Sequence, residues 1–246
     1  MTEWYRVAFG ELYPLVYGHR DVAEAEGVAM KLAPIVKASR PTLDVACGNG
    51  RYMCALQSAG LDVYGVDLSE FLLGEAAKRG PGDRVVCGDM RALPFADGAF
   101  GSAINMFTSF GYFDEDADDT RALREIARVI APGGPFVLDF INAGRVRDRI
   151  EPRSRRNVGN ALVEEWREIS GDGRVLIKRV EVTAAGRHPV AYSERLRLYS
   201  REELGAMLAD AGFDVLHSHG DYELGAFHKR NSDRLIMVCE KRTVGA

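Results

Sequence analysis

The sequence predicts an α/β fold, in which a mostly parallel sheet carries helices on both faces and an antiparallel meander is inserted. Short apolar runs alternate with helical segments between residues 41 and 140, and the same alternation returns after residue 200. Between residues 150 and 200 turn signals recur about every ten residues, which is typical of antiparallel hairpins. Alternating strands and helices imply right-handed crossovers and parallel pairing.

The N-terminal residues up to Val36 have a helical pattern. One apolar stripe recurs at spacings of three and four, the period of a helix face, and comprises Tyr5, Phe9, Leu12, Tyr13, Val16 and Tyr17. A second helix is expected from about Asp21, with Pro34 distorting or ending it.

Seven strands are expected in the main sheet, over 42–46, 61–66, 84–87, 99–106, 136–140, 214–219 and 234–240. Helices are expected over 51–59, 69–79 (capped by Ser69), 201–211, and a segment through Leu123 and Ile130 that Pro132-Gly133-Gly134 ends. The meander is expected to consist of strands over 161–169, 174–183 and 190–199.

Composition narrows the class of protein. The chain has 246 residues, and this length suits one large domain or one domain with a sizeable insertion. Its 28% charged and 46% hydrophobic residues exclude a disordered chain, and its net charge is −4. A mildly acidic balance disfavours a nucleic-acid binder. No apolar run approaches the ~18 residues of a membrane span, and the N-terminus lacks the pattern of a secretion signal, so we expect a cytoplasmic protein.

The cysteines Cys47, Cys54, Cys87 and Cys239 show no zinc-binding or disulfide spacing, so we expect reduced thiols and no metal. Cys47 is interpreted as a small filler beneath a ligand rather than as a nucleophile. His217 and His219 share one face of a strand. A packed or surface pair is the simpler interpretation, with a metal site or a general base as the alternative.

The most informative segment is Leu43–Gly50, a strand that ends in a glycine loop and leads directly into a helix. Side chains at Gly48 or Gly50 would occupy the space of a ligand lying on bare backbone. Asp67 ends the next strand, 67 − 48 = 19 residues after Gly48. This is the spacing of an acidic residue that accepts hydrogen bonds from ribose hydroxyls. An ordinary tight turn and a strand-end cap are the alternatives.

The glycine loop alone does not identify which ribose-bearing ligand binds. A dinucleotide fingerprint requires a third glycine, and Met53 stands at that position. An NAD-dependent oxidoreductase is therefore the weaker interpretation.

Several segments, in order, resemble the class I S-adenosylmethionine-dependent methyltransferases. They are Leu43–Gly50, Gly65–Ser69, Gly88–Phe95, Asn105–Phe113 and Leu123–Gly134, and the resemblance covers about residues 40–140 with a weaker continuation over 200–240. It implies a Rossmann-like, doubly wound seven-stranded sheet with S-adenosyl-L-methionine as cofactor and S-adenosyl-L-homocysteine as product. The expected domains are a helical lid (1–38), a cofactor-binding core (39–149 and 200–246) and an antiparallel substrate-cap subdomain (150–199).

The resemblance also implies roles for individual residues. Asp44 would orient the methionine ammonium, Asp67 would accept from the ribose hydroxyls, and Asp89 would accept from the adenine amine. The remaining cofactor contacts would come from backbone at Ala46, Gly48, Asn49 and Gly50, from Leu68 and Met90 on the adenine, and from Met106 beside the sulfonium.

The segment Glu11–Arg20 is similar to the lid of small-molecule N-methyltransferases, including those that act on amino sugars. This similarity would place Tyr17 near the reacting centre and Arg20 on the methionine carboxylate. Asn105-Met106-Phe107-Thr108 lacks the Asn-Pro-Pro pattern of enzymes that methylate nucleic-acid bases, so such substrates are not expected.

The acceptor pocket is expected between the N-terminal helix, residues 108–112, the end of the fifth strand and the meander. Candidate substrate residues are Phe110, Tyr112, Asn142 and His219. An amine acceptor needs only to arrive neutral, whereas an oxygen or carbon acceptor would need a base such as His19 or His219; no catalytic residue is assigned. The basic run Arg145–Arg156 is interpreted as a solvated linker, with recognition of a phosphate or carboxylate as the alternative.

We therefore expect methyl transfer from S-adenosylmethionine to a nitrogen or oxygen of a small-molecule acceptor. The alternatives are a non-catalytic S-adenosylmethionine- or S-adenosylhomocysteine-binding regulatory subunit, the NAD-dependent oxidoreductase, and an enzyme acting on macromolecules. Neither a nucleic acid nor a membrane is expected as a partner, and the sequence is compatible with a homodimer.

Overall fold

The computed structural model describes residues 4–18, 22–80, 82–184, 186 and 188–243. Its larger sheet has seven strands in the order β10-β11-β5-β4-β1-β2-β3. In chain order these are β1 (Thr42–Val45), β2 (Val63–Asp67), β3 (Val85–Cys87), β4 (Ser102–Asn105), β5 (Pro135–Ile141), β10 (Phe213–His219) and β11 (Arg234–Lys241). All pairs are parallel except those of β11, which runs antiparallel to β5 and β10. The predicted seven-stranded, mostly parallel sheet is confirmed.

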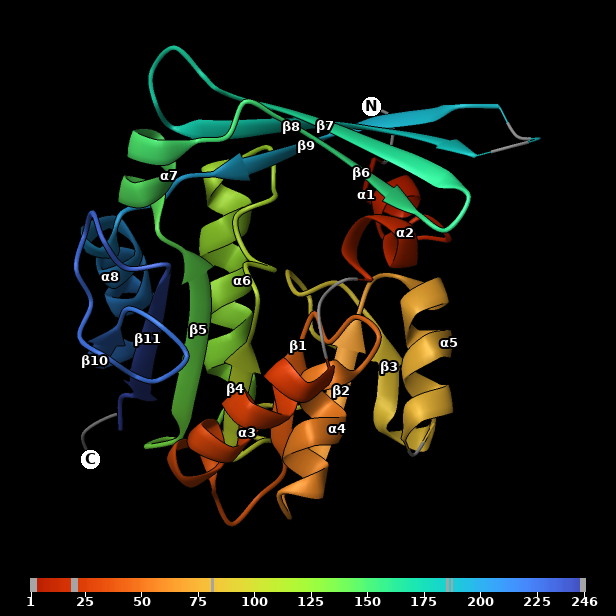
Figure 1. Cartoon of the computed structure of the whole chain (residues 1–246). Helices are drawn as coiled ribbons and strands as arrows, with labels where there is room; N and C mark the ends of the chain where they lie inside the picture. Colours follow the sequence, from red (N-terminus) through yellow and green to blue (C-terminus); the bar gives the residue numbers. More distant parts are fainter. Residues whose placement is uncertain (1–3, 19–21, 81, 185, 187, 244–246) are drawn as a thin grey trace.

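Helices cover both faces of this sheet (Figure 1). These are α3 (Val22–Val36), α4 (Arg51–Ser58), α5 (Glu70–Arg79), α6 (Asp116–Val129) and α8 (Arg201–Asp210), while the 3₁₀ turn η1 (Gly82–Arg84) precedes β3 and α7 (Ala143–Arg149) follows the end of β5. Apolar side chains of α3 and α4 pack with Ile104 and Val137 on one face, and those of α6 and α8 pack with Leu43 and Leu138 on the other. Because both faces are covered, the central strands β1 and β4 are buried along their whole length.

A four-stranded antiparallel sheet lies over the carboxyl ends of the parallel strands (Figure 1). Its strands, in spatial and chain order, are β6 (Arg153–Val158), β7 (Ala161–Ile169), β8 (Val175–Ala184) and β9 (Val190–Arg197). The meander that the turn signals predicted is confirmed, with one strand more than the sequence indicated. β6 was missed because its Ser154 and Arg156 face a cavity and its Arg153 and Arg155 face solvent, so no apolar alternation marks it. The predicted solvated linker is therefore wrong for most of this run, which forms α7 and β6.

The N-terminal helices divide between the two sheets. α1 (Trp4–Ala8) and α2 (Tyr13–Tyr17) pack with Val163, Val180 and Tyr192 of the four-stranded sheet, whereas α3 packs on α4. The apolar stripe predicted for a single N-terminal helix is split, because a turn follows Ala8 and Pro14, which lacks an N–H, stands in the first turn of α2. No helix in the described part of the chain is long and apolar enough to cross a bilayer.

Candidate active site

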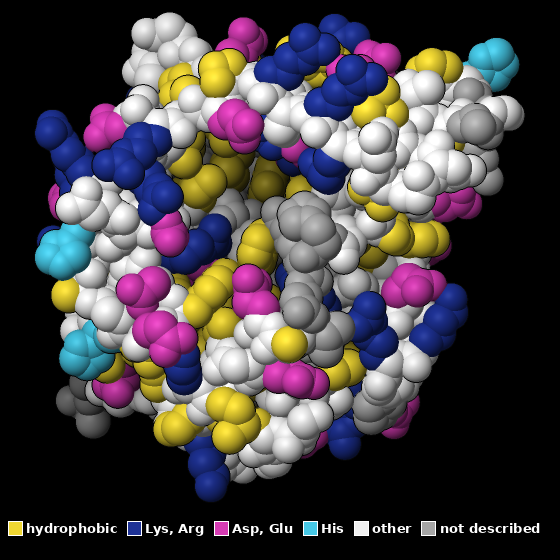
Figure 2. All heavy atoms as spheres, viewed as in Figure 1, with side chains coloured by type: hydrophobic (Ala, Val, Ile, Leu, Met, Phe, Trp, Pro, Cys, Tyr) yellow, Lys and Arg dark blue, Asp and Glu magenta, His cyan; other side chains and the backbone are white. Residues whose placement is uncertain are grey.

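A cavity of about 1280 Å³ lies between the large sheet, the helices α1 and α2, and the four-stranded sheet. The ends of β1, β2 and β4 form its floor. The strands that follow β1 in the chain lie on opposite sides of it, with β2 and β3 on one side and β4 and β5 on the other. Open α/β sheets bind their ligands at this switch point. Figure 2 shows the same face hollowed beneath the four-stranded sheet, with hydrophobic and basic side chains around the hollow.

The loop after β1 adopts left-handed backbone at Ala46 (φ 56°), Gly48 (φ 54°) and Gly50 (φ 77°). A Cβ added at Gly48 would come within 4 Å of Leu72 Cδ1 only, at 3.8 Å, so the space beside this residue is open toward the cavity. Gly50 does not line the cavity. A Cβ there would lie 3.0 Å from Cβ of Ala76 on α5, so close packing of α4 on α5, rather than a ligand, requires this glycine.

Asp67, at the end of β2, fixes this loop. Its Oδ2 accepts a hydrogen bond from the backbone N–H of Gly48 (2.8 Å), and its Oδ1 accepts one from the N–H of Ser69 (2.8 Å). Burial raises the pKa of Asp67, and these N–H donors oppose the rise. Ser69 caps α5 through Leu72 N–H and donates to the carbonyl of Phe9, which joins the N-terminal segment to this edge.

Asp44 lies beneath the same loop, 2% exposed. Its Oδ2 has no hydrogen-bond partner in the described part of the protein. Burial and the neighbouring Asp67 raise the pKa of Asp44 to about 8, and a backbone hydrogen bond from Met53 and the guanidinium of Arg51 oppose the rise. A buried acceptor facing a cavity is costly unless a ligand donates to it.

Asp89 lines the cavity beyond β3 and is clamped by Arg91. The Arg91 Nη2–Asp89 Oδ2 distance is 2.7 Å, and Arg91 Nη1 lies 2.8 Å from Oδ2 of Asp118. Burial alone would raise the pKa of Asp89, but the hydrogen bonds from Arg91 outweigh it and lower the pKa. The carboxylate is therefore ionised and oriented.

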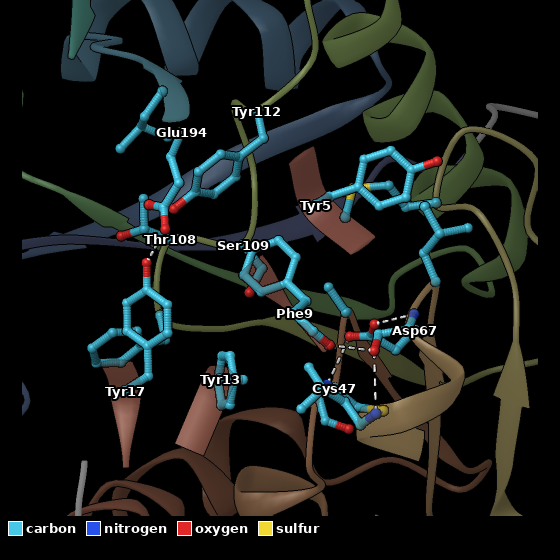
Figure 3. A pocket seen from close by; sticks show the side chains of 18 of the residues that line it. Tyr5, Phe9, Tyr13, Tyr17, Cys47, Asp67, Thr108, Ser109, Tyr112 and Glu194 are labelled. Atoms are coloured by element: carbon cyan, nitrogen blue, oxygen red, sulfur yellow. Dashed lines mark hydrogen bonds between the residues drawn. The ribbon is translucent and has the colours of Figure 1, made fainter. Parts of the chain in front are cut away.

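The other half of the cavity is walled by charged side chains of the four-stranded sheet. Glu194 accepts from the Tyr17 hydroxyl and lies 2.8 Å from Lys178 Nζ, which also donates to that hydroxyl. Figure 3 shows Tyr17 pointing toward Glu194, with Asp67 and Cys47 on the opposite side of the view. Three further charged residues form a second group on this wall, in which Arg156 and Arg167 both contact Glu165. This wall suits a polar acceptor.

The turn after β4 brings Phe107 and Thr108 into the cavity wall with φ of 63° and 60°. Non-glycine residues adopt such values rarely, at a cost of about 1–3 kcal/mol each. Asp139 of β5 holds the turn: its Oδ2 accepts from Phe107 N–H (2.8 Å) and its carbonyl accepts from Thr108 N–H (2.9 Å). Arg234 of β11 bridges Asp139 Oδ1 and Thr108 Oγ1, both at 2.8 Å.

Sequence reasoning missed this arrangement, since Asp139 and Arg234 stand within strands and no local motif marks them. Isolated charged residues in otherwise apolar strands were the available signal.

The structure brings most of the predicted site residues to this cavity. Those that line it are Tyr17, Asp44, Ala46, Gly48, Asn49, Asp67, Leu68, Asp89, Met90, Met106 and Tyr112. Arg20 and His19 lie outside the described residues. The roles of these residues remain predictions.

Three candidate substrate residues lie elsewhere. Phe110 is 1% exposed and packs on Phe140 and Tyr199 in the core. Asn142 caps α7 and donates its amide to the carbonyl of Ser232. His219 stands at the end of β10 with its ring 6.0 Å from that of His217. The described residues contain no group of three or more potential metal ligands around this pair.

Comparison with known proteins gives consistent similarities. Residues 43–138 match the "Methyltransferase domain" family. A malonyl-[acyl-carrier protein] O-methyltransferase of Erwinia pyrifoliae is 32% identical over 208 residues, which cover 82% of this chain and 72% of the relative.

An amino-sugar enzyme, the dTDP-3-amino-3,4,6-trideoxy-alpha-D-glucopyranose N,N-dimethyltransferase of Streptomyces venezuelae, is 31% identical over 138 residues. That match spans 55% of this chain and 58% of the relative's length. The solved CcbJ methyltransferase of Streptomyces caelestis superposes with a TM-score of 0.80 at 23% identity, covering 96% of this chain and 98% of that one. This likeness supports the fold.

Proposed function

We propose that this chain, which belongs to the S-adenosylmethionine-dependent methyltransferases, transfers a methyl group to an amine of a polar small molecule. The observation that carries the proposal is the composition of the cavity. One half presents loop backbone with the carboxylates Asp44, Asp67 and Asp89, and the other half presents the charged wall around Glu194. The relative from Streptomyces venezuelae, whose printed activity is N,N-dimethylation of an amino sugar, supports an amine as acceptor.

The cavity fits the cofactor in three respects. The space beside Gly48 admits a ligand against the backbone. Asp67 is held by two N–H donors, which leaves its carboxylate lone pairs on the cavity side for ribose hydroxyls. The unpartnered Oδ2 of Asp44 offers a buried acceptor to an ammonium group. When bound, S-adenosylmethionine supplies the activated methyl group.

The protein's own contribution is positioning. Holding a nucleophile and an electrophile in line can supply about 7–11 kcal/mol of barrier reduction. The turn at Phe107–Thr108 lines the cavity and is fixed by Asp139 and Arg234, so it presents a rigid surface to the acceptor. The rings of Tyr13 and Tyr17, with centroids 5.0 Å apart, form an aromatic part of the cavity wall.

The charged wall distinguishes polar from apolar acceptors. Glu194 and Glu165 are each 4% exposed, and their charges are matched by Lys178, Arg156 and Arg167. Binding an apolar molecule here would remove water from the partly exposed cations Lys178, Arg156 and Arg167 without replacing its hydrogen bonds, which is costly. Hydroxyl and amine groups of an acceptor can make those bonds.

A methyl-transfer assay tests the proposal. The purified protein is incubated with S-adenosylmethionine and matched acceptors: amino sugars, the corresponding sugars with a hydroxyl in place of the amine, and apolar amines. Release of S-adenosylhomocysteine is measured. Turnover confined to the amino sugars is expected. Turnover of hydroxyl compounds in preference to their amine counterparts, or of apolar amines alone, would contradict it.

A further inference from the structure

We propose that Arg51, the first residue of α4, binds the carboxylate of the cofactor's methionine moiety. The inference rests on the proposed function, because it concerns how the same cavity holds the cofactor. Arg51 lines the cavity and is 8% exposed. Its Nη1 is buried and has no hydrogen-bond partner among the described residues. A guanidinium in this situation lacks an acceptor, and leaving such a donor unmatched is costly.

The other described arginines of the cavity all have carboxylate partners. Arg91 contacts Asp89 and Asp118, Arg234 contacts Asp139, and the pair Arg156 and Arg167 contacts Glu165. In the described part of the chain no carboxylate oxygen is recorded within 4.0 Å of a guanidinium nitrogen of Arg51. Its cationic site is thus available to a ligand.

Aromatic rings fix where this guanidinium lies. Its central carbon is 5.5 Å from the ring centroid of Tyr52 and 5.5 Å from that of Phe107. Ring faces attract the charge, but they do not supply Nη1 with an in-plane acceptor, and it has none among the described residues. Because Phe107 belongs to the turn that Asp139 holds, Arg51 is held beside the place where β1 and β4 end.

Asp44 supplies the matching acceptor, and a bound ammonium group would favour its ionised form. Its Oδ2 is a buried acceptor without a described partner, and the charge of Arg51 acts on its pKa, yet the two side chains do not form an ion pair. An acceptor atom and a guanidinium donor that both lack a described partner, and that face one cavity, fit a ligand that carries an ammonium and a carboxylate. An α-amino acid zwitterion, with its ammonium on Asp44 and its carboxylate on Arg51, has this chemistry. Planar guanidinium donors match the geometry of a carboxylate.

Titration calorimetry with three ligands tests the assignment. S-adenosylhomocysteine carries both charged groups, 5′-deoxy-5′-(3-aminopropylthio)adenosine lacks the carboxylate, and 5′-methylthioadenosine lacks both. Arg51→Met keeps an unbranched apolar stem, and Arg51→Lys keeps the charge. Arg84→Met is the matched control, because Arg84 also stacks on a ring, that of Tyr64, but does not line the cavity.

Arg51→Met is expected to weaken S-adenosylhomocysteine about 10- to 100-fold, the loss of a charged hydrogen bond, while binding of the carboxylate-free ligand changes less than about threefold. Arg51→Lys should recover part of the loss. Equal weakening of all three ligands would show a structural role and overturn the inference, as would unchanged S-adenosylhomocysteine binding. If Arg51→Met does not fold, the same comparison is made with Arg51→Lys, as the ratio of its affinity for S-adenosylhomocysteine to its affinity for the carboxylate-free ligand. Failure of the wild-type protein to bind any of the three would instead refute the proposed function.

Discussion

The backbone N–H of Gly48 lies 2.8 Å from Oδ2 of Asp67, so the loop after β1 and the end of β2 are joined by a charge-assisted hydrogen bond across two neighbouring parallel strands. The bond orients the carboxylate toward the cavity and holds the loop in its left-handed form. One residue thus shapes the backbone surface and presents the ribose acceptor that we propose.

Replacing Asp67 by Ala is expected to lower the affinity for S-adenosylhomocysteine by about 1–3 kcal/mol, since hydrogen bonds to a charged partner are lost. Isothermal titration calorimetry measures the change. Asp62→Ala is the control, because Asp62 contacts Arg84 away from the cavity. Equal affinities for the two variants would count against the assignment of the ribose site.

The contribution of Asp44 to the stability of the ligand-free protein is expected to fall as pH rises from about 4 to 8. Burial and Asp67 raise its folded-state pKa to about 8, whereas the unfolded chain loses this proton near pH 4. Between these values the folded state binds more protons than the unfolded state, so rising pH favours unfolding. Asp44→Asn, which cannot ionise, should therefore raise the melting temperature at pH 8 by at least about 2–4 °C, equivalent to ~1 kcal/mol.

The same variant should bind S-adenosylhomocysteine less tightly, because its amide carries no charge for the ammonium. A melting temperature that does not rise at pH 8, measured without ligand by calorimetry, would contradict the pKa assignment. Wild-type protein at pH 5, where Asp44 is protonated, is the internal reference.

The ion pair of Asp139 and Arg234 should be strongly coupled. Arg234 Nε lies 2.8 Å from Asp139 Oδ1, and the Asp139 side chain is fully buried. Asp139→Ala or Arg234→Met alone should cost about 3–5 kcal/mol, because each leaves a buried charge. The double variant should cost less than the sum of the two, by at least about 1 kcal/mol. Denaturant unfolding measures these values, and additive losses would refute the coupling.

Gly50→Ala should destabilise the protein more than Gly60→Ala. Both glycines have left-handed backbone, with φ of 77° and 88°. A Cβ at position 60 would meet nothing within 4 Å, whereas one at position 50 would lie 3.0 Å from Ala76. Gly60→Ala should therefore cost about 1 kcal/mol through backbone strain, and Gly50→Ala more, through the added contact with α5. Urea unfolding compares the stabilities of the two variants. Equal losses of stability would contradict the predicted effect of the contact with Ala76.

Tyr17→Phe should weaken the attachment of α2 to the four-stranded sheet. The hydroxyl lies between Glu194 and Lys178, so its removal should cost about 1–3 kcal/mol of stability. Tyr13→Phe, one turn earlier on α2, should change stability by less than about 0.5 kcal/mol, because no hydrogen bond of its hydroxyl is recorded among the described residues. Thermal unfolding distinguishes them, and equal effects would contradict this role of Tyr17.

The sequence predicted those parts of the fold and site that have a local pattern. Short apolar runs and helical repeats located the strands and helices of the main sheet, and the spacing of Gly48 and Asp67 indicated the loop and its carboxylate. Asp139 and Arg234 could not be predicted in this way, because their partners are 32 and 126 residues away in the chain. Only the pairing of β4, β5 and β11 brings them together. β6 was missed for a related reason: its inward face is charged.

The cavity draws its two halves from different layers of the molecule. The backbone loop and carboxylates belong to the large sheet, whereas the charged wall comes from residues 153–197 with α1 and α2. On the function that we propose, substitutions on the inner face of β6–β9 are therefore expected to change which molecule is accepted without disturbing the donor half. Divergence of this one four-stranded segment would then be enough to give a chain of this architecture a new acceptor.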